Sequence, residues 1–184
     1  MMQELEQASP HARITGTVYL LYFVTAISAQ SLLTRRFTAS AEVMNLLADG
    51  FYIALTLLLY RIFRPVNRTI SLAAALLSLA GCVVMILTQL HFVGGRVTPL
   101  IFFGLFCILL GYLIWRCIFL PRLLGVLLIL AGLAWMIYPV PQLPHVLLAS
   151  IQVLGISAEA LLMLWLLAKG ISKERWWAQR AAFE

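Results

Sequence analysis

Long apolar stretches separated by short polar breaks follow one another along nearly the whole chain. A helix needs roughly 20 mostly apolar residues to cross the hydrocarbon core of a bilayer. Six stretches approach or exceed this length, and we predict that each is a membrane-spanning helix. Their ranges are 14–33, 43–63, 69–90, 100–119, 123–140 and 145–169. The predicted fold class is therefore an all-α integral membrane protein, a bundle of six transmembrane helices.

The polar breaks contain residues that disfavour a continuous helix. Proline lacks a backbone N–H donor, and glycine loosens the backbone. Such residues lie in four of the breaks: Pro65, Gly94, Gly95, Pro121, Pro141 and Pro144. We expect a single six-helix domain over residues 1–170. Residues 171–184 mix basic side chains with Trp176 and Trp177, which predicts a short interfacial helix in the C-terminal tail.

Composition supports the membrane assignment. The 184 residues are 63% hydrophobic and 11% charged, with a mean hydropathy of +0.99. Soluble domains are typically about half apolar and about a quarter charged, so a soluble enzyme and a nucleic-acid module are excluded. The lipid bilayer is the expected partner, and the net charge of +6 is expected to face lipid headgroups.

Basic residues are distributed unequally between the two sides of the predicted bundle. Arg35, Arg36 and Arg96 lie on one side, and the other ten of the 13 basic residues lie on the side of the termini. The ten are Arg13, Arg61, Arg64, Arg68, Arg116, Arg122, Lys169, Lys173, Arg175 and Arg180. Because short cytoplasmic loops are enriched in Lys and Arg, both termini are predicted to be cytoplasmic. The expected location is the bacterial inner membrane, with several passes.

Two turns on the predicted cytoplasmic side are alike. Residues 60–65 read YRIFRP and residues 115–121 read WRCIFLP, with the two Tyr/Trp–Arg pairs 55 residues apart. Each turn follows an inward helix and precedes an outward one, which predicts a duplicated hairpin of helices two–three and four–five. An aromatic–arginine pair is also favoured at any inner interface, because the arginine side chain extends to the headgroups. Both interpretations remain open.

These turns also carry a family resemblance. The stretches are 57–68 (LLLYRIFRPVNR), 111–132 (GYLIWRCIFLPRLLGVLLILAG) and 159–170 (EALLMLWLLAKG), together with 12–16 (ARITG) at the first helix. In these stretches the sequence resembles the bacterial membrane family catalogued as domain of unknown function four-three-eight-six. The resemblance implies a helical membrane domain without an established activity, so it assigns no catalytic residue.

Small residues at helical spacing predict close helix packing. Two stripes are present, Ala74, Ser78 and Gly81 on the third helix, and Gly104 and Gly111 on the fourth. Small side chains let the backbones of membrane helices approach closely. The three cysteines, Cys82, Cys107 and Cys117, fall within predicted helices and are interpreted as small apolar packing residues.

Two acidic residues lie within the predicted spans, Asp49 in the second helix and Glu159 in the sixth. A charge at mid-bilayer costs roughly 2.5 to 3.5 kcal/mol on insertion scales, so each acid needs an explanation. At 1.5 Å per residue, Asp49 lies about 9 Å and Glu159 about 21 Å from the outer helix end, so we expect no shared carboxylate pair. Asn45 shares the helix face of Asp49, and Gln152 shares that of Glu159.

These four residues form the candidate polar site in the membrane. Further polar residues lie toward the outer ends of their helices: Gln30, Thr88, Gln89 and His91. Together they predict a small polar cavity in the outer half of the bundle with Glu159 beneath it. Tyr19, Tyr22 and Tyr112 are candidate hydroxyl partners of Glu159.

Two interpretations of the acids remain open. In the structural one, protonated carboxyls hydrogen-bond between helices and add about 1 kcal/mol each to packing. In the functional one, a buried carboxyl exchanges protons or binds a cationic ligand. Neither acid has a basic partner within a span, and no span is visibly broken in its middle as in many transporters.

His91 and His145 both lie at outer helix ends, where two imidazoles could ligate a haem iron. No G-x-S-x-G or H-E-x-x-H motif is present, so we expect no enzymatic activity, no metal and no cofactor. The leading hypothesis is a small structural or accessory component, or a protein that binds an apolar ligand between its helices, alone, with other subunits or as a homo-oligomer. A proton-linked permease using the two acids is the alternative, and a haem-binding cytochrome is the second alternative.

Overall fold

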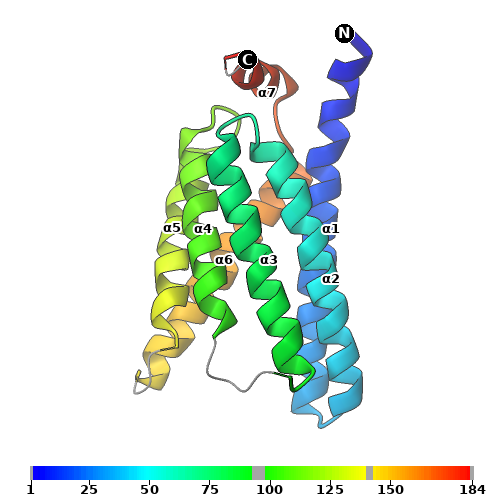
Figure 1. Ribbon diagram of the computed structural model, residues 1–184, viewed down its shortest axis with the longest axis vertical. Helices are drawn as coiled ribbons and strands as arrows, with labels where there is room; N and C mark the ends of the chain where they lie inside the picture. Colours follow the sequence, from blue (N-terminus) through cyan, green and yellow to red (C-terminus); the bar gives the residue numbers. More distant parts are fainter. Residues whose placement is uncertain (1, 93–97, 140–142, 183–184) are drawn as a thin grey trace.

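The computed structural model describes residues 2–92, 98–139 and 143–182, with side chains from Ala12 onward. This part of the chain is all-α, with seven helices and no strand. They are α1 (Met2–Thr34), α2 (Thr38–Phe63), α3 (Arg68–Gln89), α4 (Pro99–Arg116), α5 (Arg122–Ile137), α6 (His145–Ala168) and α7 (Lys173–Ala181) (Figure 1). The predicted short helix in the tail corresponds to α7.

The six long helices form a closed ring. Each helix from α1 to α6 packs against the next one in sequence, and α6 packs against α1. The two ends of the chain lie at the same end of the bundle, where α7 crosses over the helix ends (Figure 1). This arrangement follows from short connections, because a short turn makes consecutive helices antiparallel neighbours.

Five helices are long and apolar enough to cross a bilayer, and they are α1 from Ala12, α2, α3, α4 and α6. The helix α5 is apolar but has only 16 residues. At 1.5 Å per residue it extends about 24 Å, less than the roughly 30 Å of a hydrocarbon core. The predicted span over 123–140 is thus longer than the helix that the structure contains.

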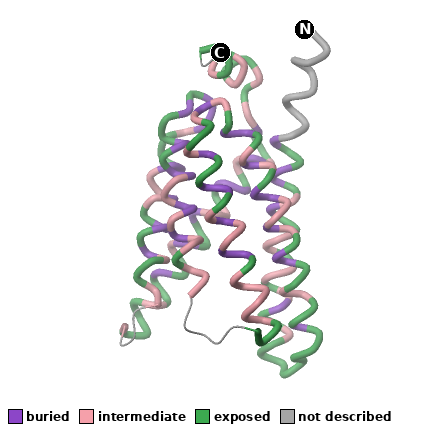
Figure 2. Tube along the Cα trace, viewed as in Figure 1, coloured by how far each residue is buried: buried purple, intermediate pink, exposed green. Residues whose placement is uncertain are grey.

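The surface of the bundle is apolar around its circumference. Large hydrophobic side chains are exposed on every long helix, among them Val24, Leu57, Leu76, Leu130 and Val153. Buried positions lie on the sides of the helices that face one another, and exposed positions lie outward (Figure 2). In water such a surface would drive aggregation, whereas in a bilayer it is the surface that contacts lipid.

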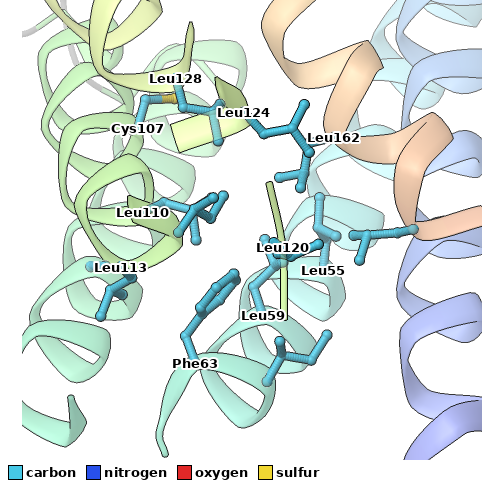
Figure 3. Packing of buried hydrophobic residues seen from close by; sticks show 14 of the residues in the cluster. Leu55, Leu59, Phe63, Cys107, Leu110, Leu113, Leu120, Leu124, Leu128 and Leu162 are labelled. Atoms are coloured by element: carbon cyan, nitrogen blue, oxygen red, sulfur yellow. The ribbon is translucent and has the colours of Figure 1, made fainter. Parts of the chain in front are cut away.

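The connection between α4 and α5 differs from the prediction. A span to residue 119 was expected, but α4 ends at Arg116 and the next residues fold back into the bundle. Phe119 and Leu120 are buried, and the Phe119 ring lies 5.9 Å from that of Phe63. Leu120 lies among leucines of the surrounding helices (Figure 3). Cys117 is already extended, and Pro121 keeps Leu120 out of the helical conformation, because the residue before a proline is restricted to extended geometry.

Glycines allow α4 and α5 to approach very closely. A Cβ atom at Gly111 would lie 2.6 Å from the carbonyl oxygen of Gly125, and one at Gly104 would lie 2.8 Å from that of Gly132. The reciprocal positions are equally tight, so the two backbones are in direct contact at two levels. The stripe predicted at Gly104 and Gly111 therefore packs against a matching stripe on α5.

The hairpin of α2 and α3 packs through hydroxyl groups instead. Thr56 and Ser78 are both buried, and their side-chain oxygens lie 2.6 Å apart. At the turn, the Asn67 side chain accepts a hydrogen bond of 2.9 Å from the Ile70 N–H and caps α3. The two hairpins thus share their orientation in the ring and differ in the chemistry of their contact.

Candidate functional site

A cavity of about 380 Å³ lies between the helices, and its lining includes Gln30 in the last two turns of α1 and Leu100 in the first turn of α4. Residues from all six long helices line it. Its polar lining comprises Gln30, Asp49, Gln152 and Glu159, together with the tyrosines Tyr22 and Tyr52. No basic residue is among the described residues of the lining.

Glu159 enters the cavity from α6 and is held by two side chains. The Tyr19 hydroxyl of α1 donates a hydrogen bond of 3.0 Å to Glu159 Oε2. The Cys107 thiol of α4 lies 4.0 Å from Oε1 and can donate to it weakly. Both donors are buried, at 2% and 1% exposure, so the carboxyl has a fixed position in the otherwise apolar interior. Tyr19 was one of three predicted hydroxyl partners of this acid.

Asp49 is held separately at the outer part of the cavity. It is 8% exposed on α2, and the Gln89 side-chain amide at the end of α3 donates a hydrogen bond of 2.9 Å to its Oδ2. The amide oxygen of Gln89 is buried without a hydrogen-bond partner. Because an amide can rotate to exchange its donor and acceptor ends, Gln89 can pair with either an ionised or a protonated Asp49.

The two acids line one cavity but each has its own partner. The expectation that they do not form a carboxylate pair agrees with the contacts, since Asp49 bonds Gln89 and Glu159 bonds Tyr19. Gln152 also lines the cavity and donates a hydrogen bond of 2.9 Å to the Tyr138 hydroxyl. Asn45 is half-buried and is not among the described lining residues, so the structure does not place it with the other three.

Aromatic rings surround the polar groups. Tyr22, Phe23, Tyr52, Phe103 and Trp135 all line the cavity. Tyr52 links several of them, with its ring 4.8 Å from Tyr22 and 5.2 Å from Phe103, both edge to face. These contacts fix the rings and present π faces and edges to the cavity.

Most of this aromatic wall was not predicted from the sequence. Tyr22 was singled out only as a hydroxyl partner, and Phe23, Tyr52, Phe103 and Trp135 were not singled out as site residues. A partial signal was available, because Tyr19, Tyr22 and Phe23 recur at helical spacing on the same helix. The contribution of Trp135 could not be read in this way, since its indole lies in the cavity by packing over Gly155 of the neighbouring helix.

The two histidines lie apart from this site. His91 follows the end of α3 and His145 begins α6, and these helices are not neighbours in the ring. Both histidines are exposed. Over the described residues, no group of three or more His, Cys, Asp or Glu side chains could hold a metal ion. The structure therefore does not bring the predicted haem ligands to the cavity.

The cavity combines acceptor groups with aromatic surface. The carboxyl and amide oxygens of the lining can accept hydrogen bonds from a ligand. The aromatic rings can contact its apolar groups and attract a cation over their faces. Small-molecule sites are typically mostly apolar with a few convergent polar groups. A lining of this kind fits a ligand with a largely apolar body and a cationic amine.

Comparison with known proteins gives one match. The model of a family described as Domain of unknown function (DUF4386) matches residues 82–170, from the end part of α3 to the end of α6. No curated protein and no solved structure matches the chain. The family resemblance predicted from the sequence is confirmed over this part of the chain, which includes Glu159, Cys107 and Trp135 of the site.

Proposed function

We propose that the protein, whose residues 82–170 match a family described as a domain of unknown function, is a non-enzymatic ligand-binding protein of the bacterial inner membrane. Its ligand is a small, mostly apolar molecule that carries a cationic amine. The observation that carries this proposal is the cavity of about 380 Å³ that Asp49 and Glu159 line together with five aromatic side chains.

The chemistry of the cavity favours a cationic over a neutral or anionic ligand. Its described lining contains two carboxyl groups and no basic side chain. A cation over an aromatic face gains about 0.5 to 2 kcal/mol, and a carboxylate adds a charge-assisted hydrogen bond. An anion would meet two carboxyls and the negative faces of the rings, so it is disfavoured by the same groups.

The membrane arrangement proposed with this function has six spans and cytoplasmic termini. Support comes from the even number of helices in the ring, from the apolar outer surface and from the ten basic residues near the end that carries the termini. In this arrangement α5 crosses a locally thin part of the bilayer, and the short helix α7 lies in the inner interface. Labelling of single cysteines introduced at Gln3 and Ser40 would test it, with modification by an impermeant reagent expected only at Ser40 in intact cells.

The ligand proposal is tested with a pair of probes that differ in charge and not in shape. Benzyltrimethylammonium and its neutral carbon analogue, neopentylbenzene, are titrated into the purified protein and followed by calorimetry. We expect the cation to bind more tightly than the neutral analogue. Glu159→Gln should weaken cation binding at least about tenfold, because a carboxylate about 4 Å from a cation contributes about 4 kcal/mol at an effective dielectric constant of about 20, and the amide carries no charge.

The matched control is Glu42→Gln. Glu42 is an exposed acid on α2, the helix that carries Asp49, and it is not among the described lining residues of the cavity. This variant should leave cation binding unchanged. Equal binding of the two probes, or equal affinity in wild type and Glu159→Gln, would contradict the proposal. A lower melting temperature with unchanged affinity would assign Glu159 to packing alone.

A proton-linked permease is the second candidate function, and the pairing of Asp49 with Gln89 favours it. The amide of Gln89 has a buried oxygen without a partner, so its rotation can accommodate a proton on Asp49. In proteoliposomes, a pH gradient should then drive accumulation of the cationic probe. Asp49→Asn should abolish that accumulation. Accumulation of the probe that does not depend on the pH gradient would exclude this candidate function.

A further inference from the structure

The short helix α7 is hydrogen-bonded to the bundle at two places, the end of α2 and the connection that follows α4. The Trp176 indole N–H donates a hydrogen bond of 3.0 Å to the carbonyl oxygen of Ile62 at the end of α2. The Gln179 side chain accepts one of 3.2 Å from the Ile118 N–H, just after α4. None of the residues of α7 is buried, so these polar contacts hold a helix with little packing of its own.

A second cavity, of about 200 Å³, lies where α7 meets the bundle. Leu58 and Ile62 of α2, Ile171 of the connection and the Trp176 ring supply its apolar walls. Arg61 from the last turn of α2 and Lys173 from the first turn of α7 supply its charged groups. This cavity is separate from the one that contains Asp49 and Glu159, and it shares none of the lining residues of that cavity.

The position of the two cations relative to the apolar spans points to a lipid headgroup. Arg61 lies two residues before the C-terminal residue of α2, Phe63, and this helix is apolar enough to cross a bilayer. At that level an arginine side chain reaches the phosphates of the lipid, and a tryptophan indole lies at the boundary between chains and headgroups. A guanidinium binds a phosphate by two parallel hydrogen bonds, and an ammonium adds a point charge.

The apolar walls select a lipid rather than a free ion. Leu58 lies one turn before Arg61 and Ile62, on the side of the cavity away from the cytoplasmic turn, and is half-buried. A phosphate held by Arg61 and Lys173 therefore has apolar side chains beside it, which suit the first methylenes of an acyl chain. Each methylene that leaves water strengthens binding, a gain that inorganic phosphate cannot make.

We propose that this cavity binds the phosphate headgroup of an anionic membrane lipid, which is clasped between Arg61 of α2 and Lys173 of α7 and holds α7 against the bundle. The site is independent of the ligand proposed for the central cavity. Its occupant contacts both α2 and α7, so bound lipid and a docked α7 stabilise each other.

The first test measures lipid retention by native mass spectrometry. The full-length protein is incubated in detergent with phosphatidylglycerol or with phosphatidylcholine. We expect one phosphatidylglycerol to remain bound in preference to phosphatidylcholine. Arg61→Gln with Lys173→Gln should weaken this binding at least about tenfold, because both charge-assisted hydrogen bonds to the phosphate are lost.

A charge-matched control separates the site from general attraction to headgroups. Arg64→Gln with Arg175→Gln also removes two positive charges from exposed residues at the same end, outside the described lining. This variant should keep its bound phosphatidylglycerol. Equal loss of lipid in the two double variants would overturn the site, and so would equal retention of the two lipids by the wild type.

Two more measurements keep the proposal testable if the charge variants fold poorly. Leu58→Trp fills the apolar wall and leaves both cations in place, and it should also release the lipid. Phosphatidylglycerol should slow tryptic cleavage within α7 of the wild type, whereas inorganic phosphate should not. Protection by inorganic phosphate equal to that by the lipid would assign the site to a free ion and overturn the lipid assignment.

Discussion

Tyr19 of α1 donates a hydrogen bond of 3.0 Å to Glu159 of α6, across 140 positions of sequence. The helices α1 and α6 are the first and last members of the ring, and their contact closes it. The same carboxyl faces the Cys107 thiol of α4 at 4.0 Å, so three helices converge on one acid. Glu159 therefore has two roles, because it forms a hydrogen bond between the two helices that close the ring and it also lines the cavity.

Removing the Tyr19 hydroxyl should destabilise the bundle. Tyr19→Phe keeps the ring, which stacks 5.5 Å from Phe23, and deletes only the donor to Glu159. We expect the free energy of unfolding in detergent to fall by about 1 kcal/mol, the usual contribution of such a bond. Tyr112→Phe, at a 39% exposed position on α4, is the control and should change little. An unchanged stability of Tyr19→Phe would mean that the bond contributes nothing to ring closure.

The glycine contact between α4 and α5 should not tolerate a methyl group. In Gly111→Ala the new Cβ would lie 2.6 Å from the Gly125 carbonyl oxygen, which belongs to the backbone and cannot rotate away. Overpacking of this kind costs about 1 to 3 kcal/mol. Gly50→Ala is a matched control, because a Cβ there meets nothing within 4 Å and alanine favours helix by up to about 1 kcal/mol. Thermal melts in one detergent should give opposite shifts, and parallel shifts would contradict the close contact.

The Thr56–Ser78 pair should show strong coupling in a double-mutant cycle. Their oxygens lie 2.6 Å apart in the interior, so Thr56→Val leaves the Ser78 hydroxyl without that partner. Each single variant, Thr56→Val or Ser78→Ala, should lose about 1 kcal/mol of stability, whereas the double variant should lose less than the sum. Additive losses, measured by unfolding in detergent, would show that the two hydroxyls act separately.

Gly155→Ala should alter the central cavity by displacing Trp135. A Cβ atom at Gly155 would overlap the indole of Trp135, which lies in the wall of the cavity. The ring must move, so we expect a shift in tryptophan emission and at least about tenfold weaker binding of the cationic probe, as for other losses of a well-packed contact. Trp135→Phe identifies the contribution of this ring to the emission. Unaltered emission and affinity in Gly155→Ala would place Trp135 outside the binding wall.

The site was only partly predictable from the residues. Asp49, Gln152 and Glu159 were identified because polar side chains are conspicuous in apolar spans, and all three line the cavity. Asn45 was included for its helix face, and it is half-buried but not among the described lining residues. Gln89 was noted only for its depth, since its contact with Asp49 joins residues 40 positions apart and depends on how α2 packs against α3. The two histidines belong to the ends of α3 and α6, which are not neighbours in the ring, and neither is among the described lining residues of the cavity.

The sequence alone determined that the chain is helical, that it belongs in a bilayer and approximately where each apolar helix lies. These properties are local, because hydropathy over a window of about 20 residues and the chemistry of prolines and glycines decide them. The tertiary structure decided the order of helices in the ring, the early end of α4, the aromatic wall and the partners of the two acids. These depend on contacts between residues far apart in the chain, and the hydropathy of a span does not specify which of its faces meets which neighbour.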